Sequence, residues 1–447
     1  MNTSQATHRT WAVSARTYGP AVKLAHHAAS IAPSATTYDA ILLSLALLAE
    51  LLHNIPSGPT LVLGSSAMVA SVGLSILMVV RRSVFPTALR TLALLWLALL
   101  LMYVLRLSPG LLSYGVKTVF QLATVVVLVL SISSVKWDMQ ALTTFIRCAI
   151  PASGWCAVAY VLARHGRGPF AEISMNMIGV WGFLAFGLCV VSAHVSQQLL
   201  WKLLSVAGCA LAAAVLFASA SRAALVGALS FLALYLLWPF LRRGRWQAHL
   251  YFAFMVGLLV FFPWLFTFGG LTAARFKELQ FLMWDVFEKN LNTRADVWGH
   301  SLNVFLESPW IGHGTGFWPF REEVALKLSC HNTFLNIAVQ TGALGAGIFV
   351  LILWSIWSIY VRSQHSAELR PFAAFLAGLI MLRSFETGMT ENDLATGYFE
   401  WAVVSIGISC AIYGTLRSLT RHTPAHQSKR RSIRQGVVGA YTRRQRS

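Results

Sequence analysis

One arginine stands where a long apolar stretch of the chain begins. Arg222 follows Ser219 and Ser221 and immediately precedes an apolar run, so it lies near the start of a predicted helix. Arg is suited to forked recognition of phosphate oxygens, and the free backbone N–H groups at a helix N-terminus also favour an anion. Arg222 is therefore a candidate phosphate-binding residue. The simpler alternative is an interfacial side chain that reaches the lipid headgroups.

A histidine at the start of another apolar stretch is the candidate for proton transfer. His331 precedes Asn332 and Thr333, which can cap the helix that follows. An imidazole can accept a proton from an alcohol at neutral pH and so prepare a hydroxyl for attack. Further along, Gly342 and Gly345 predict that a neighbouring helix approaches closely. A helix-capping or interfacial histidine is the alternative.

A second arginine lies in a mixed segment, TRADVWGHSLNVFLESPWIGHGTGFW (293–318). Thr293 can cap a helix that carries Arg294, and Pro309 ends that helix. The GHGTG string (312–316) resembles a phosphate-binding loop only superficially. It lacks the preceding strand and the Lys of a P-loop, so we predict a flexible turn.

Four further charged residues at predicted loop ends are additional site candidates. Arg164 and Arg167 lie in one basic connector. Arg383 and Glu386 are three residues apart, which predicts either an ion pair that fixes a helix or a lining of the site. The sequence contains no HExxH and no acidic metal motif in its outward-facing connectors, so a mechanism without a metal is favoured.

The composition is that of a membrane protein. The chain has 447 residues, of which 56% are hydrophobic and 11% are charged, whereas soluble globular proteins carry about 25% charged residues. Long apolar runs recur from end to end, so we predict an all-α, polytopic integral membrane protein. The net charge of +19 falls mostly in short connectors and tails, where membrane topology explains it better than nucleic acid does.

Apolar runs of about 17–25 residues can cross a bilayer. We predict twelve, near 40–55, 60–80, 88–106, 114–133, 141–162, 174–192, 199–218, 223–241, 248–268, 332–360, 371–388 and 398–416. Pro151 and Gly154 interrupt the fifth run. A long connector separates the ninth and tenth spans, and a connector of that length is usually functional or separately folded.

The positions of Lys and Arg predict which side each connector faces. The connectors at 81–90, 241–246 and 361–370 and both tails are basic, so they face the cytoplasm. The predicted organisation is a cytoplasmic tail at 1–37, helices one to nine at 38–268, an outward-facing loop at 269–331, helices ten to twelve at 332–416, and a basic cytoplasmic tail at 417–447.

Three stretches together resemble the O-antigen ligase and polysaccharide polymerase superfamily. They are SRAAL (221–225), RADVWGHSLNVFLESPWIGHGTGF (294–317) and HNTFLNIAVQTGALG (331–345). The ligase signature is a His, then Asn, Ser or Gln, nine residues, a Gly, two residues, and Gly, Thr or Tyr. His331, Asn332, Gly342 and Gly345 match it completely. The resemblance covers the second half well, and the first half agrees in span count and polarity.

This resemblance implies a GT-C-type glycosyltransferase in the bacterial inner membrane, with its active site and long loop in the periplasm. The donor would be a glycan on undecaprenyl diphosphate, with Arg222 and Arg294 holding the diphosphate and His331 acting at the acceptor hydroxyl. The reaction would invert the anomeric centre and need no nucleotide, metal or other cofactor. Membrane lipid and proteins of polysaccharide export or chain-length control are further expected partners.

Several functions fit these observations. A polymerase would transfer the growing chain to the next lipid-linked repeat unit, and a ligase would transfer the finished chain to lipid A–core. The GTGFW string (314–318) resembles exopolysaccharide polymerases, so a polymerase is favoured. A flippase or transporter would place its charges near the bilayer midplane, whereas this chain places them at the outer edge. A non-catalytic membrane scaffold is the remaining alternative.

Overall fold

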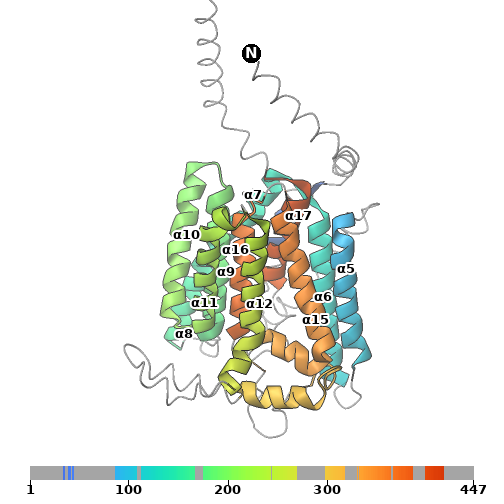
Figure 1. Ribbon diagram of the computed structural model, residues 1–447. Helices are drawn as coiled ribbons and strands as arrows, with labels where there is room; N and C mark the ends of the chain where they lie inside the picture. The colour runs from blue at the N-terminus through green and yellow to red at the C-terminus, as the bar shows by residue number, and fades with distance from the viewer. Residues whose placement is uncertain are drawn as a thin grey trace, which may run out of the picture.

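The computed structural model describes residues 34–35, 39–41, 43–44, 86–107, 112–166, 175–242, 244–268, 297–317, 330, 332–363, 366–385 and 398–416. These residues form a bundle of helices (Figure 1). The helices are α5 (Thr87–Leu105), α6 (Leu112–Ser134), α7 (Met139–Arg147), α8 (Ala149–Arg164), α9 (Met175–Val195), α10 (Leu199–Ala218), α11 (Arg222–Leu241), α12 (Arg245–Phe268), α15 (Thr333–Arg362), α16 (Arg370–Phe385) and α17 (Tyr398–Tyr413). Residues 297–307 are also helical.

Within the described residues, six helical segments are long and apolar enough to cross a membrane. The protein is therefore a helical membrane protein, as its composition predicts. A helix occupies each predicted span from 88–106 onward. Apart from residues 39–41 and 43–44, the first two predicted spans lie outside the described residues, so the total of twelve spans and the length of the outward loop stay predictions.

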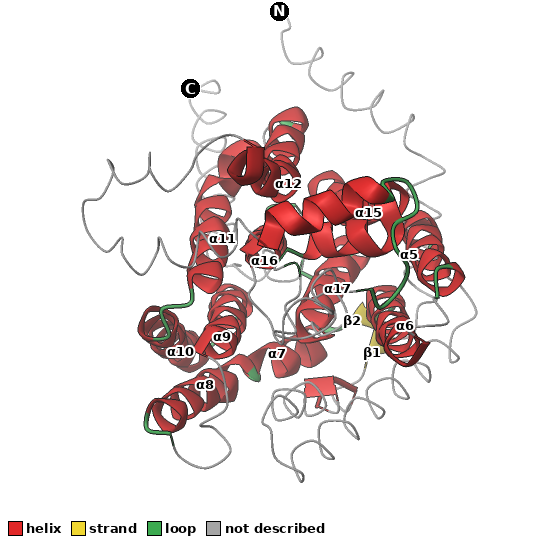
Figure 2. Ribbon diagram, turned by 90° about the horizontal axis from the view of Figure 1, so that it is seen from below, coloured by secondary structure: helices red, strands yellow, loops and turns green. Residues whose placement is uncertain are grey.

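The packing of the helices explains which apolar faces are buried. Helix α9 is apolar on all sides and is buried along most of its length, as expected for a helix in the interior of a bundle. It packs against α8, α10 and α11 (Figure 2). Helix α10 instead exposes Leu199, Leu203 and Phe217. We assign that face to the lipid, which is as apolar as these side chains.

Helices α11 and α16 make the closest contact in the centre of the bundle. A Cβ added at Gly227 would lie 3.0 Å from the carbonyl oxygen of Gly378, and one added at Gly378 would lie 2.7 Å from that of Gly227. Glycines at both positions therefore let the two backbones meet. Nearer the other end of the pair, Arg370 donates a hydrogen bond from Nε to the carbonyl of Tyr235, so the two helices run antiparallel.

The bundle has two distinct ends. Helix 297–307 lies across one of them, at the bottom in Figure 1, and we name it the loop end. At the far end, β1 (Ser34–Ala35) pairs in parallel with β2 (Lys136–Trp137), Ser34 with Lys136. The hydroxyl of Tyr413, the last residue of α17, donates to the carbonyl of Ser134 at 2.7 Å, beside β2. Helix α17 therefore begins at the loop end.

The predicted interruption of the fifth span is displaced. The helix breaks at Cys148, between α7 and α8, and α8 runs through both Pro151 and Gly154. Pro151 is the third residue of α8, and the first four N–H groups of a helix have no intrahelical partner, so a proline costs little there. The prediction that Pro151 and Gly154 interrupt the span is wrong by a few residues.

Helix α15 is broken at Gly342, where φ is 70° and ψ is −172°. A Cβ at this position would lie 2.2 Å from the carbonyl carbon of Trp310. A Cβ at Gly345 would meet Oγ1 of Thr341 at 2.0 Å. The prediction that these glycines admit a neighbouring helix is therefore wrong. Gly342 breaks the helix against a loop, and Gly345 makes room for a side chain of its own helix.

Candidate functional site

Asn332 joins the start of α15 to the end of α16. Its Oδ1 accepts a hydrogen bond from the backbone N–H of Leu335 at 2.8 Å, so the predicted helix cap is confirmed. Its Nδ2 donates to the carbonyl oxygen of Ser384 at 3.3 Å. The Asn332 side chain is almost fully buried. His331, the residue before it, lies outside the described residues.

Arg383, one residue before Ser384, forms a buried ion pair with α17. Its Nη2 lies 2.9 Å from Oε1 of Glu400, and the two side chains are 13% and 5% exposed. A buried charge is stable in such a place only when it is paired and hydrogen-bonded. Glu386, the partner predicted from the spacing, lies outside the described residues, so the ion pair that the structure gives for Arg383 is with Glu400.

Arg222 is the first residue of α11, which a sharp turn separates from α10. Ala220 in this turn has a φ of 51°, and the side chain of Ser221 is buried. Ser221 is the N-cap residue, but its side chain makes no capping hydrogen bond. The prediction that Arg222 begins a helix is therefore confirmed, and its side chain is half-buried.

The antiparallel packing of α11 and α16 places Arg222 level with Arg383. Gly227 and Gly378 lie side by side. Five residues back along α11 is Arg222, and five residues on along α16 is Arg383. Arg222 and Arg383 therefore lie at the same end of two contacting helices, and Arg383 is next in sequence to Ser384, which binds Asn332. This is the loop end of the bundle.

The GHGTG string belongs to a loop, residues 308–317, that we name the clamp loop. The backbone N–H of His313 donates to the carbonyl of Val339 at 2.8 Å, and that of Gly314 donates to Gln340 at 3.0 Å. These carbonyls lie just before the break in α15. A broken helix inside a membrane protein needs such partners for its freed backbone groups. The predicted turn is confirmed. The N–H groups of His313 and Gly314 already donate to carbonyls of α15, so they do not form a phosphate-binding loop.

The clamp loop also ties α15 to the end of α5. The guanidinium of Arg106 donates from Nη2 to the carbonyl oxygen of Gly312 at 2.7 Å. The backbone N–H of Thr315 donates to the carbonyl of Arg106 at 2.8 Å. The loop is thus fixed on both sides, and much of it is buried. The loop is therefore a turn, as predicted, but hydrogen bonds hold it on both sides, so it is not the flexible turn that its glycines predict.

Residues 207–350 match the family model described as O-antigen ligase. This stretch, about a third of the chain, is similar to the O-antigen ligase family. The resemblance to this ligase and polymerase superfamily is therefore confirmed, and the matched residues include the turn before Arg222, the clamp loop and Asn332. A comparison with curated proteins finds no match to the chain.

The structure does not bring all of the predicted site residues together. Arg164 ends α8, where it is exposed. Helix α8 packs on α9 and α10, on the side of α9 away from α16 (Figure 2). Arg167 and Arg294 lie outside the described residues, as His331 and Glu386 do. Their roles stay predictions.

Glu400 is the charged residue that reasoning from the O-antigen ligase motifs missed. It is the one charged residue in the predicted span 398–416. An ionisable residue inside an apolar span is costly and is by default a candidate functional residue. That signal was present in the sequence, whereas the identity of its partner, 17 positions earlier, was not.

Proposed function

We propose that this protein transfers a glycan from a lipid diphosphate to an acceptor hydroxyl at the loop end of its membrane domain. The observation that carries the proposal is that Arg222, Arg383 and Asn332 lie at this same end of the bundle, within and beside the stretch that matches the O-antigen ligase family. The family match supports membrane glycosyl transfer in surface polysaccharide biosynthesis.

In this proposal the arginines bind the leaving group. Arg222 and Arg294 hold the diphosphate of an undecaprenyl-diphosphate-linked glycan, and their guanidinium groups can form two parallel hydrogen bonds to phosphate oxygens. As the bond from the anomeric carbon to the diphosphate oxygen breaks, that oxygen takes the bonding electron pair. Cationic donors already in place stabilise the charge that develops there.

His331 is the proposed general base. It takes the proton of the acceptor hydroxyl while the hydroxyl oxygen forms a bond to the anomeric carbon, opposite the departing diphosphate. The products are the extended glycan and the free lipid diphosphate, with the anomeric centre inverted. Asn332, by capping α15 and binding the end of α16, is proposed to hold His331 in place beside the arginines.

The location and partners complete the proposal. The protein would lie in the bacterial inner membrane with both termini in the cytoplasm and the loop end in the periplasm. The acceptor would be a second lipid-linked glycan or lipid A–core. Purified protein in detergent with lipid-linked glycan tests the reaction, because release of undecaprenyl diphosphate marks a transferase, whereas a flippase or a scaffold releases none. Turnover that is unchanged by EDTA would agree with a metal-independent reaction.

We favour a polymerase, because the sequence at 314–318 resembles exopolysaccharide polymerases. The ligase is the second candidate, since the matching family is described as O-antigen ligase. Deletion of the gene separates the two. Loss of long chains with single repeat units retained indicates a polymerase, and lipid-linked polymer that is not attached at the surface indicates a ligase.

A further inference from the structure

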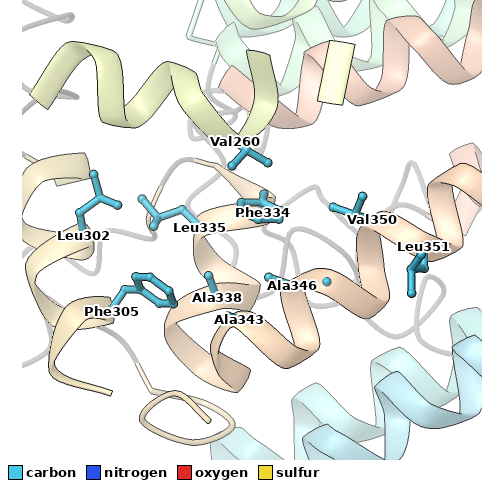
Figure 3. Close-up of a pocket in the computed structure, with 11 residues that line it drawn as sticks. Val260, Leu302, Phe305, Phe334, Leu335, Ala338, Ala343, Ala346, Val350 and Leu351 are labelled. Carbon is cyan, nitrogen blue, oxygen red and sulfur yellow. The ribbon is translucent and has the colours of Figure 1, made fainter. Parts of the chain in front are cut away.

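An apolar cavity of about 630 Å³ lies beside the break in α15. Its walls come from three elements, α12, helix 297–307 and both halves of α15 (Figure 3). The lining residues are Val260, Leu302, Phe305, Phe334, Leu335, Ala338, Ala343, Ala346, Gly347, Val350 and Leu351. None of these side chains carries a polar atom, so the ligand segment that fits is hydrocarbon.

One end of the cavity adjoins the candidate site. Leu335 lines the cavity, and its backbone N–H is the group that Asn332 caps. Two hydroxyls that neighbour lining residues, those of Ser301 and Thr333, are buried and have no hydrogen-bond partner within the described part of the chain. Thr333 directly follows Asn332, so one of these polar groups lies at the start of α15, where that helix joins α16.

The other end of the cavity reaches the surface of the bundle. Val350 and Leu351 belong to the half of α15 that follows the break. Leu351 is 51% exposed, and α15 is one of the helices that can cross the membrane. A molecule in the bilayer could therefore enter from the side. The cavity thus extends from the bilayer to the polar junction.

We infer that this cavity binds the hydrocarbon tail of the lipid-linked donor, next to its diphosphate head. The inference rests on the proposed function and adds the place where the tail lies. An amphiphile with a polar head at the loop end and an apolar tail in the bilayer matches both ends of the cavity. Lipid tails are as apolar as this lining, so the tail gains mainly packing and orientation from the cavity rather than hydrophobic transfer.

Gly347 offers a way to fill the cavity without disturbing the fold. A Cβ at this position meets no atom within 4 Å, so a larger side chain has open space to enter. With a donor on an undecaprenyl tail, Gly347→Phe should raise KM about tenfold or more, because it removes binding shared by the ground and transition states. With a donor whose diphosphate carries a methyl group in place of the isoprenoid tail, KM should change by less than about twofold, and Gly347→Ala should behave as wild type with both donors. Equal effects of Gly347→Phe on the two donors would overturn the inference.

Photolabelling of the wild-type protein tests the cavity without any turnover. The probe is undecaprenyl diphosphate with a diazirine in its tail, close to the head. We expect label on Leu302 or Phe334, removed by unlabelled undecaprenyl diphosphate and retained in excess phosphatidylglycerol. Absence of label at the cavity, or equal competition by phosphatidylglycerol, would overturn the inference. Specific label in a protein that releases no undecaprenyl diphosphate from lipid-linked glycan would support the tail site and contradict the proposed transfer.

Discussion

Arg383 and Glu400 form an ion pair between the end of α16 and the first turn of α17, with Nη2 and Oε1 2.9 Å apart and both side chains largely buried. Arg383 also lies one residue before Ser384, whose carbonyl binds Asn332. The ion pair joins α16 to α17, and the Asn332–Ser384 hydrogen bond joins α15 to α16, so the ends of three helices meet here. It connects the stability of the bundle to the geometry of the candidate site.

Removing one partner of this pair should destabilise the protein more than removing both. Arg383→Met or Glu400→Leu alone leaves a buried charge without its partner, which typically costs about 3–5 kcal/mol. The double variant leaves no such charge and should recover most of the thermal stability, measured in detergent by size-exclusion chromatography after heating. Single variants that melt with the wild type would contradict a structural role for the pair.

Substitutions of Asn332 test its role as a helix cap and its proposed role in holding His331 in place. Asn332→Ala loses the cap, which typically costs about 1 kcal/mol, and also the bond to Ser384. Asn332→Asp keeps an oxygen for the N–H of Leu335 but brings a negative charge to the proposed diphosphate site. Because the Asn332 side chain is almost fully buried and faces the carbonyl of Ser384, an unpaired carboxylate is costly there, so we expect the Asp variant to be no more stable than the Ala variant and poor in glycan transfer. An Asp variant with wild-type turnover would argue against an anion at this junction.

His331→Ala should abolish glycan transfer while folded protein remains. Loss of a general base typically slows a reaction by about 10²–10⁴-fold. The measurement is release of undecaprenyl diphosphate by protein that elutes as a single peak in detergent. Transfer close to the wild-type rate would remove His331 from the proposed mechanism.

Arg222→Lys keeps the charge but loses the planar fork. The variant should slow transfer by about 10- to 100-fold, the effect of losing one hydrogen bond to a charged group. Arg242→Lys is the matched control, since Arg242 follows the opposite end of α11 and is exposed. If both Lys variants kept full activity, Arg222 would be an interfacial arginine only.

Gly342→Ala should disrupt the break in α15. The φ of 70° and ψ of −172° at this position fall in a region that is nearly restricted to glycine, where another residue costs about 1–3 kcal/mol. The added Cβ would also collide with the backbone of Trp310. Thermal unfolding should show a large loss of stability. Gly257→Ala in α12 is the control, because a Cβ there meets nothing within 4 Å, and equal melting of the two variants would contradict the assignment.

The family motif was visible in the sequence, but its physical interpretation was partly wrong. Gly342 and Gly345 match the ligase signature, and their spacing is equally compatible with helix packing and with a helix break. The backbone of Trp310 decides between these, because it occupies the space where a Cβ of Gly342 would be. That contact joins two segments separated by a long stretch of chain, so local sequence could not reveal it.

The apolar helices, the membrane class and the resemblance to the O-antigen ligase family could be predicted from the sequence alone. Long apolar runs make helices in lipid whatever surrounds them, since each backbone hydrogen bond is local, and the match at residues 207–350 follows from residue types in order. Three relationships become visible only in the folded protein: Arg222 lies level with Arg383, Glu400 pairs with Arg383, and the clamp loop holds the broken α15. These relationships depend on how helices far apart in the chain are aligned against one another. For α11 and α16, that alignment depends on Gly227 and Gly378, because the two backbones can approach closely only where both residues are small.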